Sequence, residues 1–200
     1  MGCRTRVMGN VHDRTHETTC GRGNLSFTSI NLPRIGIEAK GDIKRFYELL
    51  DKRIDLVIHQ LYARFKIQAA KHVYNYPFLM GQGVWLDSDK LGPEDNIAEV
   101  LKHGTLSIGF IGLAETLKAL TGKHHGESEE CQKLGLEIVG YMRKRMDDES
   151  EKRGLNFTLL ATPAEGLSGR FVRIDKKKYG IIPGITDSEY YTNSFHIPVY

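Results

Sequence analysis

The sequence predicts an α/β fold, and three observations support this class. Short apolar runs rich in β-branched and aromatic residues alternate along the chain with longer segments in which apolar residues recur every three or four positions. That alternation is typical of a parallel or mixed sheet whose strands are connected by helices. The 200 residues, 40% hydrophobic and 26% charged, are enough for one soluble domain with a sizeable core.

The first third of the chain predicts a loop, a strand and a long helix. Residues 1–24 are rich in Gly, Thr, Arg and His and lack helical periodicity, so we expect a long loop there. The run "LSFTSINL", residues 25–32, is a strand signal that Pro33 ends. A helix is expected over about 42–74, capped by Asp42, because apolar residues recur at helical spacing throughout it.

The middle of the chain predicts a buried strand that leads directly into a helix. The glycine-interrupted run "FLMGQGVWL", residues 78–86, favours a loop and a strand, and a short helix follows Asp95. The apolar run at 103–113 then indicates a buried strand that turns into a helix. That helix is expected to reach about Leu120 and to stop at Gly122.

The last third alternates helix and strand again. A helix over about 128–152 carries one apolar stripe that includes Cys131, and "LNFTLLAT", residues 155–162, indicates another buried strand. A helix over 163–178 and a final strand at 193–200 complete the order. No internal repeat or linker divides the chain, so we expect one domain.

The charge pattern narrows the classes of partner. The net charge is +3, and the two basic runs, 143–145 and 176–178, both fall on predicted helices and indicate solvated faces. The sequence has neither a concentrated basic stripe nor a known DNA-binding motif, which argues against DNA binding. A small anionic ligand remains compatible with this net charge. No apolar run is long enough for a membrane span and no signal peptide is recognisable, so we expect a cytoplasmic protein.

The cysteine and histidine spacings argue against a disulfide framework or a metal site. Cys3, Cys20 and Cys131 are widely spaced and form no C-x-x-C motif, so we expect free thiols, with Cys131 packed in the core. The adjacent histidines of "GKHHGES", residues 122–128, lack the i, i+4 spacing of a helical metal pair. They indicate a linker or the start of a helix, and we expect no bound metal.

The strongest local signal for a ligand is "LLATPAEGLSGR", residues 159–170. Thr162 is expected to cap the following helix, with Pro163 in the first helical position and Glu165 completing a capping box. Gly166 and Gly169 remove side chains from the first turns. A strand that leads into open backbone amides of this kind can bind an anion. The alternative is a well-capped helix that binds nothing.

The thiol of "MGCRTRV" allows three kinds of chemistry. Cys3 could be a nucleophile if His12 or His16 folds back as its base, or a redox thiol with Cys20 as its partner. It could also transfer a hydrogen atom, which needs neither. Asn24, between a glycine and a strand, indicates either a turn or an amide presented to a ligand.

Seven blocks of the sequence resemble, in family order, the anaerobic, class III ribonucleoside-triphosphate reductases, which are glycyl-radical enzymes. The blocks are "GCRTRV", "GRGNLSFTSINLPRI", "PFLMGQGVW", "LKHGTLSIGFIGLAE", "KHHGES", "LLATPAEGLSGRF" and "GITDSEYYTNSFHIPVY". The resemblance covers nearly all of this chain but under a third of a typical family member. We therefore expect the chain to be a piece of a larger protein.

The resemblance implies a fold and a set of site residues. It implies about half of a ten-stranded α/β barrel, with 1–24 as a finger loop that carries the radical cysteine, Cys3, and 25–200 as barrel strands and helices. Asn24 corresponds to an active-site asparagine that hydrogen-bonds at the ribose or the reductant, and Met1 to a methionine beside the cysteine. The segment expected to hold the substrate phosphates comprises Thr162, Ala164, Glu165, Gly166, Leu167 and Ser168.

The resemblance also implies cofactors and partners. A glycyl radical on a C-terminal segment outside this chain would convert Cys3 to a thiyl, and formate would act as reductant. The parent enzyme is expected to be a cytoplasmic homodimer with a radical-SAM activating enzyme, a ribonucleoside triphosphate substrate and neither nucleic acid nor membrane as partner.

Two departures from the family pattern bear on activity. The family's second active-site cysteine and its radical glycine have no counterpart here, and Cys20 falls in a different position. We therefore expect the chain to lack turnover alone. The competing interpretations are a nucleotide-binding half-barrel without catalysis and, third, a Cys–His hydrolase.

Overall fold

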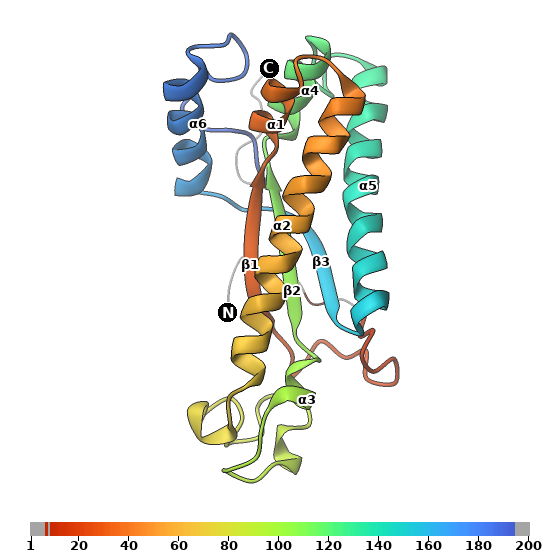
Figure 1. Ribbon diagram of the computed structural model, residues 1–200, viewed down its shortest axis with the longest axis vertical. Helices are drawn as coiled ribbons and strands as arrows, with labels where there is room; N and C mark the ends of the chain where they lie inside the picture. Colours follow the sequence, from red (N-terminus) through yellow and green to blue (C-terminus); the bar gives the residue numbers. More distant parts are fainter. Residues whose placement is uncertain (1–6, 8, 195–200) are drawn as a thin grey trace. The chain divides into compact units, whose positions relative to one another are not determined.

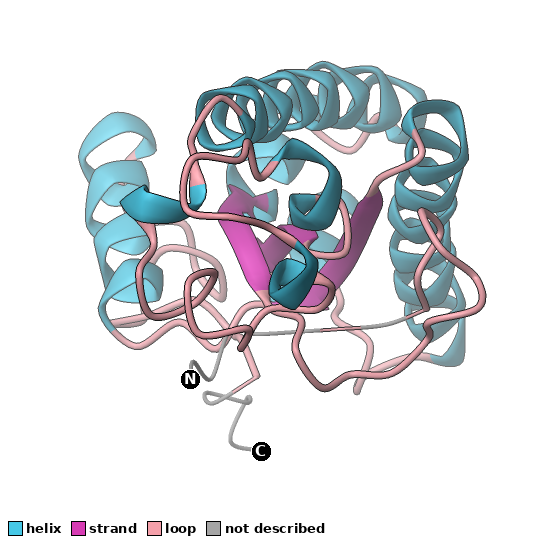
Figure 2. Cartoon of the chain, turned by 90° about the horizontal axis from the view of Figure 1, so that it is seen from below, coloured by secondary structure: helices cyan, strands magenta, loops and turns pink. Residues whose placement is uncertain are grey.

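Three parallel strands form one sheet in the part of the chain that the structure describes. A computed structural model describes residue 7 and residues 9–194. The strands are β1 (Asn24–Asn31), β2 (Thr105–Ile111) and β3 (Asn156–Ala161), hydrogen-bonded in the order β1-β2-β3. They lie side by side in Figure 2 and are labelled in Figure 1. The α/β class and the strands expected at 25–32, 103–113 and 155–162 are confirmed.

Helices connect and follow these strands. Those of the described residues are α1 (Leu32–Ala39), α2 (Ile43–Ala69), α3 (Ala98–Leu101), α4 (Leu113–Thr121), α5 (Glu129–Arg153) and α6 (Gly166–Tyr179), with single 3₁₀ turns η1 (Val73–Asn75) and η2 (Ser88–Lys90). The predicted cap of α2 is confirmed, because the Asp42 carboxylate accepts a hydrogen bond from the Arg45 amide at 3.0 Å. None of the helices described is both long and apolar enough to cross a membrane.

Four expectations differ from the structure. Pro33 does not merely end a strand, because it occupies the first turn of α1, where a missing N–H costs no helical hydrogen bond. Residues 78–86 form turns rather than including a strand, and α2 ends at Ala69 rather than near 74. Of the strand expected at 193–200, residues 195–200 lie outside the described residues and the other two are not in a strand.

The chain divides into two compact units. Unit 1 comprises the residues up to Thr28, Val57–Ile108 and Lys144–Leu159, and unit 2 comprises Ser29–Leu56, Gly109–Arg143 and the residues from Leu160 onward. The three strands and the two long helices, α2 and α5, each contribute residues to both units.

The core of unit 1 holds a long turn segment against the start of β2. The Trp85 side chain is 7% exposed, and its indole N–H donates to the Val100 carbonyl at 2.7 Å. The Leu86 amide donates to the Gly21 carbonyl at 2.7 Å, which ties the N-terminal loop to the same segment. Buried hydroxyls of Ser107 and Thr158 hydrogen-bond between β2 and β3 at 2.9 Å.

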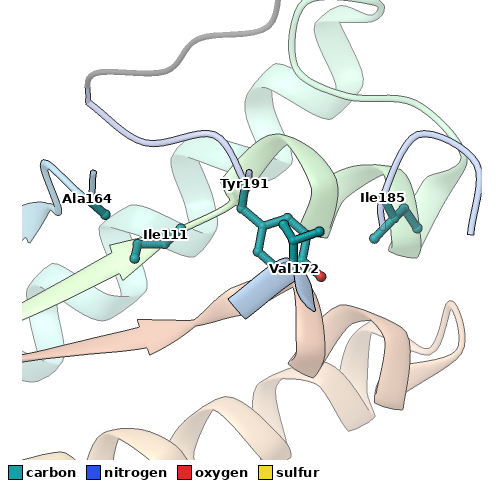
Figure 3. Packing of buried hydrophobic residues seen from close by; sticks show 5 residues of the cluster. All are labelled: Ile111, Ala164, Val172, Ile185 and Tyr191. Atoms are coloured by element: carbon teal, nitrogen blue, oxygen red, sulfur yellow. The ribbon is translucent and has the colours of Figure 1, made fainter. Parts of the chain in front are cut away.

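The core of unit 2 depends on a close approach of α1 and α4. A Cβ added at Gly36 on α1 would lie 3.1 Å from the Thr116 carbonyl oxygen, so any larger residue there would require the two helices to shift by a few tenths of an ångström. A second cluster comprises Ile111, Ala164, Val172, Ile185 and Tyr191, all buried. In Figure 3 the ring of Tyr191 lies beside Val172. This cluster packs the C-terminal segment of unit 2 against α6.

Candidate functional site

The turn after β3 starts from a buried threonine. The Thr162 amide donates to the Phe110 carbonyl at 3.0 Å, and the Thr162 hydroxyl is hydrogen-bonded to the Ser29 hydroxyl at 2.9 Å. Thr162 therefore extends the pairing between strands and does not cap α6. The predicted capping box is wrong, because the N-cap of α6 is Glu165 and the Thr162 hydroxyl is hydrogen-bonded to Ser29 on β1.

Helix α6 begins three residues later than the capping box requires, and its N-cap residue makes no side-chain cap hydrogen bond. The residue before its first turn is Glu165, which makes no side-chain cap hydrogen bond, and Pro163 precedes the helix instead of opening it. The Ser168 hydroxyl donates back to the Ala164 carbonyl at 2.9 Å. The first backbone N–H groups of a helix have no partner within it, so those of α6 are available to an anion.

A depression of about 300 Å³ lies beside this helix start within unit 2. Its lining residues are Glu165, Gly166, Gly169, Arg173, Glu189 and Tyr190. A side chain added at Gly166 would meet nothing within 4 Å, whereas one at Gly169 would lie 3.1 Å from the Glu189 carbonyl oxygen. The glycines thus leave the backbone open on one side and let the C-terminal segment approach on the other.

Only part of the predicted phosphate segment lines the depression. Glu165 and Gly166 do, whereas Thr162, Ala164 and Ser168 are buried beneath the turn and Leu167 is half-buried outside the lining.

Sequence reasoning missed three lining residues, of which Arg173 could have been found. Gly166, Gly169 and Arg173 follow one another at i, i+3 and i+7, so they share one face of a helix. Glu189 and Tyr190 come from a loop without periodicity and carried no signal.

A buried ion pair holds the C-terminal segment against α6. Asp175 is fully buried, and its carboxylate accepts hydrogen bonds from Arg34 at 2.7 Å, from Asn31 at 2.7 Å and from the Tyr191 hydroxyl at 3.0 Å. Burial, with the negative charge of Asp175 nearby, raises the pKa of Tyr191 well above its usual range. Tyr191 therefore stays protonated and fixes its neighbour Tyr190 at the rim of the depression.

A second buried carboxylate fixes the residue that follows. Glu115 on α4 accepts the Thr192 amide at 2.9 Å and the Thr192 hydroxyl at 2.7 Å, while the Gly112 amide donates to the Thr192 carbonyl at 2.7 Å. Burial raises the pKa of Glu115 despite these hydrogen bonds. The two carboxylates thus hold two consecutive residues, Tyr191 and Thr192, which directly follow the lining residues Glu189 and Tyr190.

The predicted radical loop is only partly described. Met1 and Cys3 lie outside the described residues. Residues 9–23 contain turns and neither helix nor strand, as expected, and Asn24 is the first residue of β1, half-buried. Asn24 belongs to unit 1 and the depression to unit 2.

The remaining candidate side chains have local roles. Cys131 is buried, as predicted, while Cys20 is exposed. The His16 ring is hydrogen-bonded to Asp13 at 2.5 Å. The His124 amide donates to the Glu127 carboxylate at 2.8 Å before α5, which confirms a turn at the start of a helix. Among the described residues, no three His, Cys, Asp or Glu side chains gather as metal ligands would.

The fold is that of the anaerobic ribonucleotide reductases. The crystal structure of the Thermotoga maritima enzyme with citrate in the active site superimposes with a TM-score of 0.66, covering 84% of this chain and 30% of that one, at 19% identity. The same enzyme with dATP bound in the specificity site superimposes with a TM-score of 0.60, over 83% of this chain and 26% of that one, at 19% identity.

The chain belongs to the anaerobic ribonucleoside-triphosphate reductase family, whose model matches residues 1–200. The anaerobic ribonucleoside-triphosphate reductase of Escherichia coli is 38% identical over the whole chain, and that of Enterobacteria phage T4 is 33% identical. The chain spans 28% of the length of the first of these relatives and 32% of the second.

Proposed function

We propose that the chain is part of the catalytic chain of an anaerobic ribonucleoside-triphosphate reductase and that the turn after β3 holds the substrate phosphates. The observation that carries this proposal is the uncapped start of α6 beside a depression lined by Arg173. The family match and the relatives' names support the substrate class.

The phosphate role follows from the groups around the depression. The N–H groups of Gly166 and Leu167 are the donors that this helix start offers to an anion, whereas Ser168 is fully buried and supports the turn from beneath. The exposed Arg173 guanidinium adds a positive charge one to two turns further along α6. Glu165 and Glu189 offset part of that charge, so the backbone amides and Arg173 together must favour the phosphates.

The chemistry is that of a thiol radical, with Cys3 as the reacting group. A glycyl radical elsewhere in the parent chain would take the hydrogen atom of the Cys3 S–H group, so that the glycine regains its C–H bond and Cys3 becomes a thiyl. Its sulfur takes the 3′ hydrogen atom of the ribose, and the 2′ hydroxyl leaves with a proton as water. Formate, oxidised to carbon dioxide, supplies the two electrons of the reduction. Cys3 finally returns the 3′ hydrogen.

Asn24 and Met1 complete this proposed site. The Asn24 amide, at the start of β1, would hydrogen-bond to the ribose or to formate, and Met1 would lie beside Cys3. An amide suits this role because it donates and accepts without changing charge during a radical reaction.

The parent protein is proposed to be a cytoplasmic homodimer activated by a radical-SAM enzyme. Residues 1–24 are its finger loop, and residues 25–200 are about half of a ten-stranded barrel. The three parallel strands connected by helices support this proposal, because an α/β barrel is built from units of that kind. The Thermotoga maritima reductases have the same local fold.

The test replaces the matching segment of the Escherichia coli reductase with this chain and measures deoxyribonucleotide formation under anaerobic conditions with formate. We expect turnover that Cys3→Ser abolishes, because a hydroxyl does not form the radical at an accessible energy. The matched control is Cys20→Ser, an exposed thiol that should retain turnover. Turnover by the Cys3→Ser chimera would exclude the proposed chemistry.

A further inference from the structure

A buried polar network in unit 1 holds the loop at residues 9–22. Its centre comprises Asn10, His103 and Asn156, which are 1%, 3% and 3% exposed. The amide nitrogen of Asn10 lies 2.9 Å from Nδ1 of His103, and the amide nitrogen of Asn156 donates to Oδ1 of Asn10 at 3.2 Å. Loop and strand ends are therefore connected through three side chains rather than through apolar packing.

Backbone partners fix the orientation of both amides. The Asn10 nitrogen donates to the His16 carbonyl at 3.1 Å, and the Asn10 oxygen accepts from the Asp13 amide at 3.4 Å. The Asn156 oxygen accepts from the Val11 amide at 2.8 Å, while the Asn156 nitrogen donates to the Lys102 carbonyl at 2.9 Å. A backbone N–H only donates and a carbonyl only accepts, so neither amide can be turned over without losing these bonds.

This orientation determines the protonation form of His103. Because the Asn10 nitrogen donates, Nδ1 of His103 must accept and carries no proton. A neutral imidazole then has its proton on Nε2, which lies 3.1 Å from the Asp87 carboxylate and donates to it. The Arg22 guanidinium, at the base of the loop, donates to the His103 carbonyl at 2.8 Å.

The charged groups around His103 divide into those on the loop and those beside it. On the loop, the His12 ring packs edge-on at 5.1 Å, and burial followed by His103 lowers the pKa of His12. Beside the loop, Lys90 pairs with Asp87 at 2.6 Å, and Lys102 pairs with Glu99 at 2.8 Å. Arg22 and the Asp13–His16 pair are the other charged groups of the loop that face the network.

We propose that His103 positions the loop at residues 9–22 as a neutral imidazole whose proton lies on Nε2. The proposal is connected to the proposed function because residues 9–22 follow Cys3 in the sequence. It makes His103 a positioning residue, since it acts on the loop through Asn10 and not on a substrate.

The first test is the ¹⁵N NMR spectrum of the imidazoles in the 200-residue chain at neutral pH. We expect His103 Nδ1 to have the shift of an unprotonated nitrogen and Nε2 that of a protonated one. A proton on Nδ1, or on both nitrogens, would overturn the proposal whether or not the chain binds a nucleotide.

Asn10→Asp supplies the second test, because it replaces the donor that faces Nδ1 of His103 by a carboxylate that accepts a hydrogen bond. We expect Nδ1 to show the ¹⁵N shift of a protonated nitrogen in this variant. The matched control, His16→Gln, removes another imidazole of the loop, whose backbone carbonyl and not its ring contacts Asn10, and should leave the His103 shifts unchanged. An Asn10→Asp chain in which Nδ1 stays unprotonated would refute the role of His103. If this variant does not fold, the tautomer in the native chain still decides the proposal.

Discussion

At the scale of single residues, the Arg34–Asp175 ion pair is the interaction on which unit 2 depends most. Asp175 is fully buried, and three side chains donate to it. Asp175→Ala leaves a half-buried guanidinium and two polar groups without their acceptor, so we expect a loss of about 3–5 kcal/mol in the free energy of unfolding. Tyr191→Phe removes one hydrogen bond and should cost about 1 kcal/mol.

Urea unfolding measures both losses, and the exposed Lys144–Asp148 pair provides the control. Its side chains are 72% and 59% exposed, so Asp148→Ala should change stability by no more than about 0.5 kcal/mol. Equal losses of unfolding free energy in Asp175→Ala and Asp148→Ala would show that burial does not determine how strongly the Arg34–Asp175 ion pair stabilises the chain.

Glu115 predicts a dependence of stability on pH. Burial raises its folded-state pKa above the ordinary 4.5, so the folded chain retains a proton that the unfolded chain releases as pH rises. Its contribution to stability is therefore complete below about pH 4.5 and declines as pH rises through the folded-state pKa. Glu115→Gln cannot ionise, and we expect its stability relative to the parent chain to increase from about pH 4 to about pH 7. Urea unfolding at the two pH values checks this, and a relative stability that falls over the interval would contradict the burial effect.

At the scale of elements, the junction of β2 and α4 requires glycine. Gly112 has a φ of 82°, and an added Cβ would lie 2.2 Å from Cγ of Pro33 on α1. Gly112→Ala should therefore destabilise the chain by at least about 2 kcal/mol. Gly140 on α5 has open space around it, so Gly140→Ala should stabilise the chain by about 0.5–1 kcal/mol. Thermal or urea unfolding distinguishes the two, and a neutral Gly112→Ala would disprove the close contact between α1 and α4.

The elements themselves were largely predictable, because periodicity and terminal residues act locally. The apolar spacing in α2 and α5 and the run at 103–113 each determined an element within a few residues of its ends. The start of α6 was not predictable in this way. Thr162 has the local sequence of a cap, but its hydroxyl is bound to Ser29, which is 133 positions away in the chain. Tertiary contacts of this kind override a capping signal.

At the scale of the whole molecule, the site could be predicted only where its residues share one element. Gly166 and Arg173 lie on one helix face, whereas Glu189 reaches the depression through a loop fixed by Tyr191 and Thr192. No spacing rule connects that loop to α6. The family resemblance, by contrast, rested on blocks distributed along the chain, and the match over residues 1–200 confirms it.

The chain by itself should bind without turnover. In the reaction proposed above, a glycyl radical outside these 200 residues activates Cys3, and the chain spans 28% of the length of its Escherichia coli relative. We expect no deoxyribonucleotide from the 200-residue chain under anaerobic activation, measured by chromatography of the products. Product formation by the isolated chain would mean that its own residues suffice for radical chemistry.

The most direct test of the account is titration calorimetry of a ribonucleoside triphosphate against the chain and two glycine variants. Gly166→Leu fills the open side of the α6 start, and Gly140→Leu places the same side chain on α5, where space is equally open. We predict that the parent chain and Gly140→Leu bind alike and that Gly166→Leu binds at least about tenfold more weakly, a loss of about 1.4 kcal/mol. Equal affinity of the Gly166→Leu and Gly140→Leu chains, or no binding by the parent chain, would contradict the assignment of the phosphates to this turn.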